Sequence, residues 1–145
     1  ICKARSGFSE AIRLGEVSEI QLDGWVALSV DVSDQSRIPP LPYWRMLVLD
    51  DYAAGTFRQS AVLRGQFRSE RSAVVLNGTA AATPDPAMVW TFYLEAGVSR
   101  YLPLPGPFVS LRFRENQIFR HAPGPALLAL REEPAVMTAY RVDGP

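Results

Sequence analysis

The chain has 145 residues, of which 48% are hydrophobic, and its 15 basic residues balance 15 acidic ones. This length fits one domain, and a domain of this size buries roughly 68–70% of its unfolded surface, so a core can form without disulfides or bound metal. The charge balance excludes a strong field for attracting polyanions, which argues against nucleic acid as a partner, and the short apolar runs exclude a transmembrane helix.

The first 23 residues show no sustained hydrophobic periodicity. Gly7 and Gly15 interrupt them, and we expect an irregular N-terminal segment, residues 1–23. The single cysteine, Cys2, excludes an internal disulfide. Because the chain starts at Ile1 without a visible signal peptide, we expect residues 1–145 to be one domain from a longer protein.

The first clear strand pattern follows Gly24. Hydrophobic residues alternate with small or polar ones over residues 26–32, which is the period of two of a half-buried strand. Residues 33–42 are polar and end in Pro39-Pro40-Leu41-Pro42. We expect a loop there, because proline removes backbone donors and disfavours helix.

Residues 44–60 predict an antiparallel hairpin, with strands at residues 44–52 and 56–60 joined by a tight turn at residues 53–55. Residues 62–66 are expected to continue the second strand or to follow it.

Two contacts are expected within this hairpin. Trp44 and Phe57 would pack as a cross-strand aromatic pair, which contributes roughly 0.2–1 kcal/mol more than small residues do. Arg45 would pair with Asp50 or Asp51 at the end of the hairpin.

The middle of the chain holds the most regular strand pattern, over residues 88–94, in which Trp90 falls on the face expected to be buried. Ahead of it, residues 73–76 run into Asn77-Gly78, a dipeptide favoured at the centre of a type I′ hairpin turn. A second turn is expected at residues 83–86, which read Thr-Pro-Asp-Pro.

Further short strands are expected in the C-terminal third. A strand over residues 109–114 is expected to turn at Glu115-Asn116-Gln117 into residues 118–120. Residues 126–131 suit a helical turn and a buried strand equally. The other features expected here are an extended piece at 101–104, a turn cluster at 121–125 and a final strand at 136–142.

Many short strands, frequent turn signals and the lack of a long amphipathic pattern predict an all-β domain. The expected architecture is an antiparallel β-sandwich or open barrel with roughly eight or nine short strands and little helix.

The chain offers no recognisable catalytic set. A cysteine enzyme would need Cys2 and His121 together, but Cys2 lies at the terminus and His121 precedes Pro123-Gly124-Pro125, so we interpret them as a terminal thiol and a solvated loop histidine. One histidine and one cysteine cannot form a structural zinc site, and calcium and phosphate loop motifs are lacking. We therefore expect no catalytic residue, no metal and no cofactor in this chain.

Acidic residues leave one enzymatic alternative open. Paired carboxylates for glycoside hydrolysis could come from Asp50, Asp51, Glu95 and Glu132, although no spacing rule joins them.

Two surface features have alternative interpretations. A basic patch could form if the strands that carry Arg64, Arg68, Arg71, Arg112, Arg114 and Arg120 adjoin, although a solvated face is the default. Exposed aromatic residues on a β-sheet can stack on sugar rings, and Trp25 and Tyr93 are the better candidates because they lie on the polar faces of their strands.

Residues 43–57 carry a resemblance to a known family. The residues that make up this signature are Tyr43, Trp44, Arg45, Asp50, Tyr52, Gly55 and Phe57. The segment resembles a signature of membrane-anchored bacterial transglutaminase-like proteins of the TgpA type, and residues 14–20, 94–95, 100–104 and 140–142 are similar to flanking parts of that family.

The resemblance implies an extracytoplasmic, periplasmic-side β-rich domain that is tethered to the cell membrane in the full-length protein. It implies a non-catalytic scaffold, because the family's Cys-His-Asp site would lie beyond Pro145. The implied partners are the transglutaminase-like core and membrane helices of the same protein, with a cell-wall or protein substrate. A glycan- or cell-wall-binding module is the alternative.

Overall fold

A computed structural model describes residues 12–13, 26–77 and 88–144. Within these residues half of the protein is in antiparallel strands and 7% is helical, which confirms the all-β prediction. The elements are β1 (Ile12–Arg13), β2 (Leu28–Val32), the 3₁₀ turn η1 (Gln35–Arg37), β3 (Asp51–Ala53), β4 (Thr56–Arg58), α1 (Ala61–Gly65), β5 (Arg68–Leu76), β6 (Met88–Leu94), β7 (Ser110–Ala122), β8 (Leu127–Leu130) and β9 (Thr138–Gly144).

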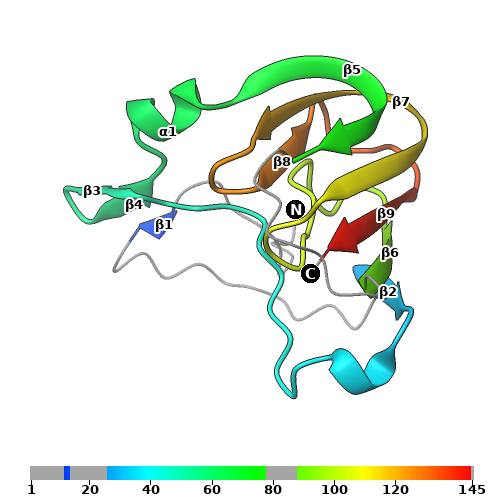
Figure 1. Cartoon of the computed structure of the whole chain (residues 1–145). Coiled ribbons are helices and arrows are strands. Elements are labelled where there is room, and N and C mark those ends of the chain that lie inside the picture. Colours follow the sequence, from blue (N-terminus) through cyan, green and yellow to red (C-terminus); the bar gives the residue numbers. More distant parts are fainter. Residues whose placement is uncertain (1–11, 14–25, 78–87, 145) are drawn as a thin grey trace, which may run out of the picture.

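The main sheet has the strand order β2-β6-β9-β7-β5, and β8 pairs with the C-terminal part of β7. It is curled into a half-barrel (Figure 1), so the open-barrel form of the prediction describes it best. The C-terminal strand β9 lies in the middle of the sheet, between β6 and β7.

Alternating burial gives the sheet one apolar face. Every second residue of β6, from Met88 to Leu94, is buried, and Trp90 is among them as expected. The 95–109 connection supplies further core residues, including Leu102, Leu104 and Phe108, which pack against the sheet residues. The core is therefore made by the sheet and by one long connection.

Strand β7 corrects the expected turn at Glu115-Asn116-Gln117. The strand runs without interruption from Ser110 to Ala122. Its pairing with β5 is irregular, because Arg112 faces Val74 whereas Gln117 faces Ser72, so the extra residues of β7 form a bulge. Polar residues that suit a turn also suit a bulge, since both leave backbone groups unpaired.

A second, small sheet has the order β1-β4-β3 and stands at the edge of the molecule beside α1 (Figure 1). Its β3–β4 hairpin confirms the predicted turn, because Ala53 faces Thr56 and the two residues between them, Ala54 and Gly55, have positive φ angles of 51° and 80°. Positive φ at both central positions is the requirement of a type I′ turn.

The rest of the predicted hairpin is wrong. Residues 44–50 are not a strand, although Arg45 makes an isolated antiparallel bridge with Leu104. Residues 62–66 do not continue β4, because Ala61–Gly65 form the short helix α1.

Two ambiguous or mistaken predictions are resolved by strand pairing. Leu127–Leu130 form the strand β8, and all four residues are buried. Asn77 does not centre a hairpin between neighbouring strands, because β5 pairs with β7 whereas β6 pairs with β2 and β9.

Some predictions fall outside the described residues. They concern Cys2, Trp25, Gly78, the turn at residues 83–86 and most of the N-terminal segment. In the part of the chain that the structure describes, no helix has the length and apolar character needed to cross a membrane.

Candidate functional site

The signature residues Trp44 and Arg45 join their segment to the main sheet. The Trp44 ring packs edge-on against Trp90 and Phe92, with centroid distances of 5.6 and 5.3 Å, and not against Phe57 as expected. The backbone of Arg45 exchanges two hydrogen bonds with Leu104, of 2.7 and 2.9 Å.

The Arg45 side chain does not pair with Asp50 or Asp51, because its Nη1 donates to the carbonyl oxygen of Pro125 at 2.9 Å. Asp51 instead accepts from Nε of Arg58 at 3.3 Å, across the hairpin.

Asp50 fixes the start of α1. Its carboxylate accepts hydrogen bonds of 2.6 Å from the backbone N–H and from the hydroxyl of Ser60. The Ser60 oxygen in turn accepts from the Leu63 N–H at 3.0 Å and caps the helix. The hydrogen bonds from Ser60, first from its hydroxyl and then from its backbone, hold the pKa of Asp50 below its usual value.

The aromatic cross-strand pair of the hairpin consists of Tyr52 and Phe57. These residues face each other on β3 and β4, and their ring centroids lie 4.6 Å apart. Both rings are exposed, and so is Tyr43, at 82%. Gly55 occupies the turn, at a positive φ of 80° that suits glycine.

His121 corrects the interpretation of a solvated loop histidine. It belongs to β7, is 4% exposed, and its Nε2 lies 3.2 Å from Oδ1 of the buried Asn77. Burial lowers its pKa, and the nearby Glu70 partly offsets this by raising it. The side chain is therefore part of a buried polar pair, and among the described residues no cluster could hold a metal ion.

The four candidate acids do not gather at one place. Asp50 and Asp51 hold Ser60 and Arg58, Glu95 is exposed just after β6, and Glu132 lines a hollow beside Glu133. The structure thus gives the first two acids structural partners.

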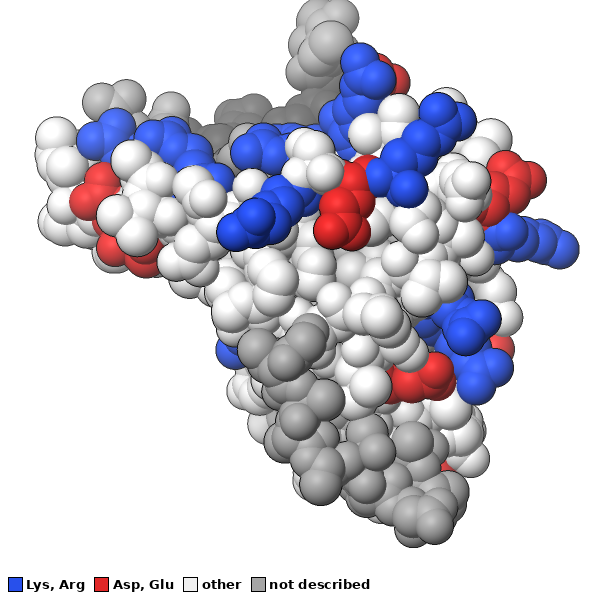
Figure 2. Space-filling model, turned by 45° about the horizontal axis from the view of Figure 1, so that its top comes forward, with Lys and Arg blue, Asp and Glu red and all other residues white. Residues whose placement is uncertain are grey.

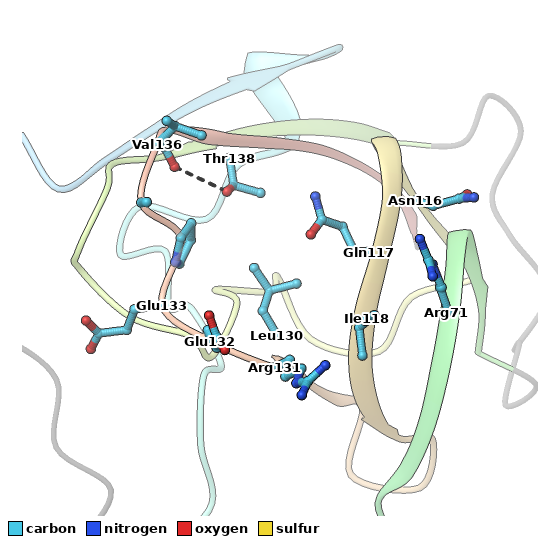
Figure 3. A pocket seen from close by; sticks show the side chains of 12 residues that line it. Arg71, Asn116, Gln117, Ile118, Leu130, Arg131, Glu132, Glu133, Val136 and Thr138 are labelled. Carbon is cyan, nitrogen blue, oxygen red and sulfur yellow. Dashed lines mark hydrogen bonds between the residues drawn. The ribbon is translucent and has the colours of Figure 1, made fainter.

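One hollow, of about 490 Å³, lies where the sheet divides between β8 and β9. Figure 3 shows Gln117 of β7 and Leu130 of β8 pointing into it, with Thr138 of β9 at one side. Thr138 donates a long hydrogen bond of 3.5 Å to the carbonyl oxygen of Val136. This hollow is lined by apolar residues such as Ile118 and Leu130 and by charged residues of both signs, such as Arg131 and Glu132. Such a lining indicates no single class of ligand.

A second hollow, of about 470 Å³, lies on the outer face of the sheet. Tyr93 lines it, together with Arg112, Arg114 and Arg141. Arg112 and Arg141 face each other on paired strands, and Arg141 also contacts Asp143 at 3.4 Å. The glycan-binding alternative expects an exposed ring in a groove, whereas Tyr93 is half-buried, and that alternative stays a prediction.

A third, smaller hollow of about 100 Å³ lies between α1 and the main sheet. It brings together two arginines of the possible basic patch, Arg64 and Arg120, whereas Arg112 and Arg114 line the outer face. Figure 2 shows basic side chains spread over one face of the molecule, with acidic ones interspersed. The arginines of the possible basic patch thus line different hollows, as a solvated face allows.

Sequence reasoning missed Gln59 and Arg100, which complete this small hollow. They come from separate connections and belong to no local motif. Only the fold brings them to Arg64 and Arg120.

Comparison with known proteins identifies one family. The model of the family described as the TgpA N-terminal domain matches residues 3–143. No curated protein and no solved structure matches the chain.

Proposed function

The chain belongs to the TgpA N-terminal domain family, and we propose that it is the extracytoplasmic, non-catalytic domain of a membrane-bound transglutaminase-like protein. In this proposal the Cys-His-Asp site lies in an attached core. The domain holds that core, or the cell-wall or protein substrate that it uses, at a fixed place near the membrane.

The position of β9 is the observation that supports a positioning role. Strands hydrogen-bond β9 on both sides, and Tyr140 and Val142 are buried in the core. The Tyr140 hydroxyl donates a hydrogen bond of 2.6 Å to the carbonyl oxygen of Pro103. A strand held in this way cannot pivot, so a core joined beyond it would leave the domain in one direction.

A flexible linker inserted in the full-length protein tests this role. A flexible linker of about ten Gly-Ser residues after Pro145 has a root-mean-square end-to-end distance of roughly 17 Å, so the core would no longer be held in one position. We expect activity on envelope substrates to fall several-fold, whereas activity on a small soluble acyl donor stays unchanged.

The matched control is the same linker inserted at Ala96, in an exposed turn. It leaves the direction of β9 unchanged, so we expect no loss. An equal loss from both insertions, or no loss after Pro145, would contradict the positioning role. A reporter fused after Pro145 tests the location: alkaline phosphatase should be active there, and an active cytoplasmic reporter would contradict the proposal.

A further inference from the structure

An uncharged, largely apolar run of residues between η1 and β3 is exposed to solvent. It reads Pro39-Pro40-Leu41-Pro42-Tyr43, and we call it the proline segment. All of its residues are exposed, Leu41 at 73% and Tyr43 at 82%. Single exposed apolar side chains are common on protein surfaces, whereas a continuous exposed run is typical of an interaction site.

Both ends of the proline segment are fixed to the rest of the protein. Ile38 on one side and Trp44 on the other are half-buried and pack against the hydrophobic core. In Figure 1 the segment belongs to the cyan connection at the bottom of the view, apart from the main sheet. The chain therefore anchors two large side chains in the core and leaves the residues between them outside it.

The sequence favours the polyproline II conformation for this segment. Proline fixes φ at about −65°, and a residue that precedes proline is kept out of the helical region. Ile38, Pro39 and Leu41 each precede a proline. Ile38 has φ −76° and ψ 130°, close to the polyproline II values of about −75° and about 145°.

The hydrogen bonding of the proline segment agrees with this conformation. Residues 39–43 make no hydrogen bond with any other residue that the structure describes. Polyproline II has no internal hydrogen bonds, and its carbonyl groups stay solvated and free to accept from a partner.

The spacing of the side chains matches the pattern that polyproline-binding grooves recognise. Polyproline II has about three residues per turn, so Pro39 and Pro42 lie on one edge and Pro40 and Tyr43 on the next. Grooves that bind such ligands are lined by aromatic side chains. A preformed segment also loses little conformational entropy on binding, because proline already restricts its backbone.

We propose that the proline segment is a docking site for a partner protein whose groove is lined by aromatic side chains. The segment carries no charge, so packing and hydrogen bonds to its carbonyl groups select the partner. A rigid spacer is the other role of proline-rich segments, but a spacer does not require that Leu41 and Tyr43 be exposed. The proposal is independent of the positioning role, which depends on β9.

Binding of the 145-residue chain to isolated polyproline-binding modules, measured by calorimetry, tests the proposal. The probes are SH3 and WW domains that accept Pro-Pro-Leu-Pro ligands. We expect Pro42→Ala and Tyr43→Ala each to weaken binding at least about tenfold, because each removes a side chain from a contact edge. Pro107→Ala is the matched control, since Pro107 is an exposed proline of another connection. No binding to any probe, or equal loss in the control, would overturn the proposal.

Tyr43→Ala also separates binding from folding. Its ring is exposed, so we expect the melting temperature to stay unchanged while binding weakens. A free peptide of residues 37–45 measures what the fold contributes. We expect the folded chain to bind several-fold more tightly than this peptide, because Ile38 and Trp44 hold the segment at both ends. Equal or tighter binding by the peptide would contradict a segment that the fold presents.

Photocrosslinking in the full-length protein tests what occupies the segment. A photoreactive p-benzoylphenylalanine replaces Leu41 in one variant and, as a control, Val62 of α1, which is 75% exposed. We expect a discrete adduct with another protein at position 41 that disappears when Pro42→Ala is added. An adduct only with a second copy of the chain, the same adduct at both positions, or an adduct that survives Pro42→Ala would contradict the proposal.

Discussion

His121, which is buried beside Asn77, makes the stability of the fold depend on pH. Burial lowers the pKa of His121, so the folded protein keeps the imidazole neutral at a pH where the unfolded chain is protonated. The unfolded chain then binds more protons below its own pKa of about 6.5. The stabilisation is present in full above that value and is lost as the pH falls toward the lowered folded pKa.

We therefore predict that the melting temperature falls between pH 7 and pH 5. The variant His121→Gln, which has no titrating ring, should lose this dependence. Glu70→Gln should make it steeper, because Glu70 raises the pKa of His121. Asp34 and Asp50, whose pKa values lie below 3.8, respond only at lower pH. A melting temperature of the unchanged protein that is the same at pH 7 and at pH 5 would contradict this prediction.

At the scale of elements, backbone strain is concentrated in two turns. Ala54 and Ala126 have positive φ angles of 51° and 55°, which favour glycine over alanine. Ala54 is exposed, whereas Ala126 is buried in the core. The same substitution should therefore have different effects at the two positions.

Ala54→Gly should stabilise the protein by about 0.5–1 kcal/mol, because it relieves strain in the β3–β4 turn and removes no buried contact. Ala126→Gly should gain less or destabilise, because it also removes a buried methyl group that contributes about 0.8 kcal/mol. Urea unfolding of both variants measures the difference. Equal gains at the two positions would show that burial at Ala126 is unimportant.

Local sequence patterns correctly predicted those elements whose structure is determined by residues close together in the sequence. The alternation of β6 and the positive-φ turn after β3 are of this kind. The helix α1 was missed because its five residues are too few to show a period, and its start is fixed by Asp50 from outside the segment. Strand β8 was ambiguous because both of its faces are buried, which removes alternation.

The candidate sites were less accessible from the sequence than the fold. His121 lies beside a proline-rich turn, and nothing in its local sequence shows that Asn77 would enclose it. The small hollow is lined by Gln59, Arg64 and Arg120. The pairing of β5 with β7 brings α1, which precedes β5, close to Arg120 of β7. Such sites depend on tertiary contacts that no short pattern records.

At the scale of the whole molecule, residues 43–45 connect the small sheet to the main one. Trp44 packs on Trp90 and Phe92, and Arg45 bonds to Leu104 and Pro125. The small β1-β4-β3 sheet has strands of only two or three residues, too short to form a stable core of its own. Its order should therefore depend on this connection.

We predict that Trp44→Ala destabilises the protein by about 2–4 kcal/mol, because it removes a large, half-buried ring from the core. Tyr43→Ala is the matched control, since the neighbouring ring is 82% exposed and should have almost no effect. Hydrogen exchange should show that Trp44→Ala loosens β3, β4 and α1 more than β6 and β9, because the latter keep their pairing on both sides. Equal loosening of all strands would mean that Trp44 supports the core as a whole, and an unchanged melting temperature would mean that the segment is held elsewhere.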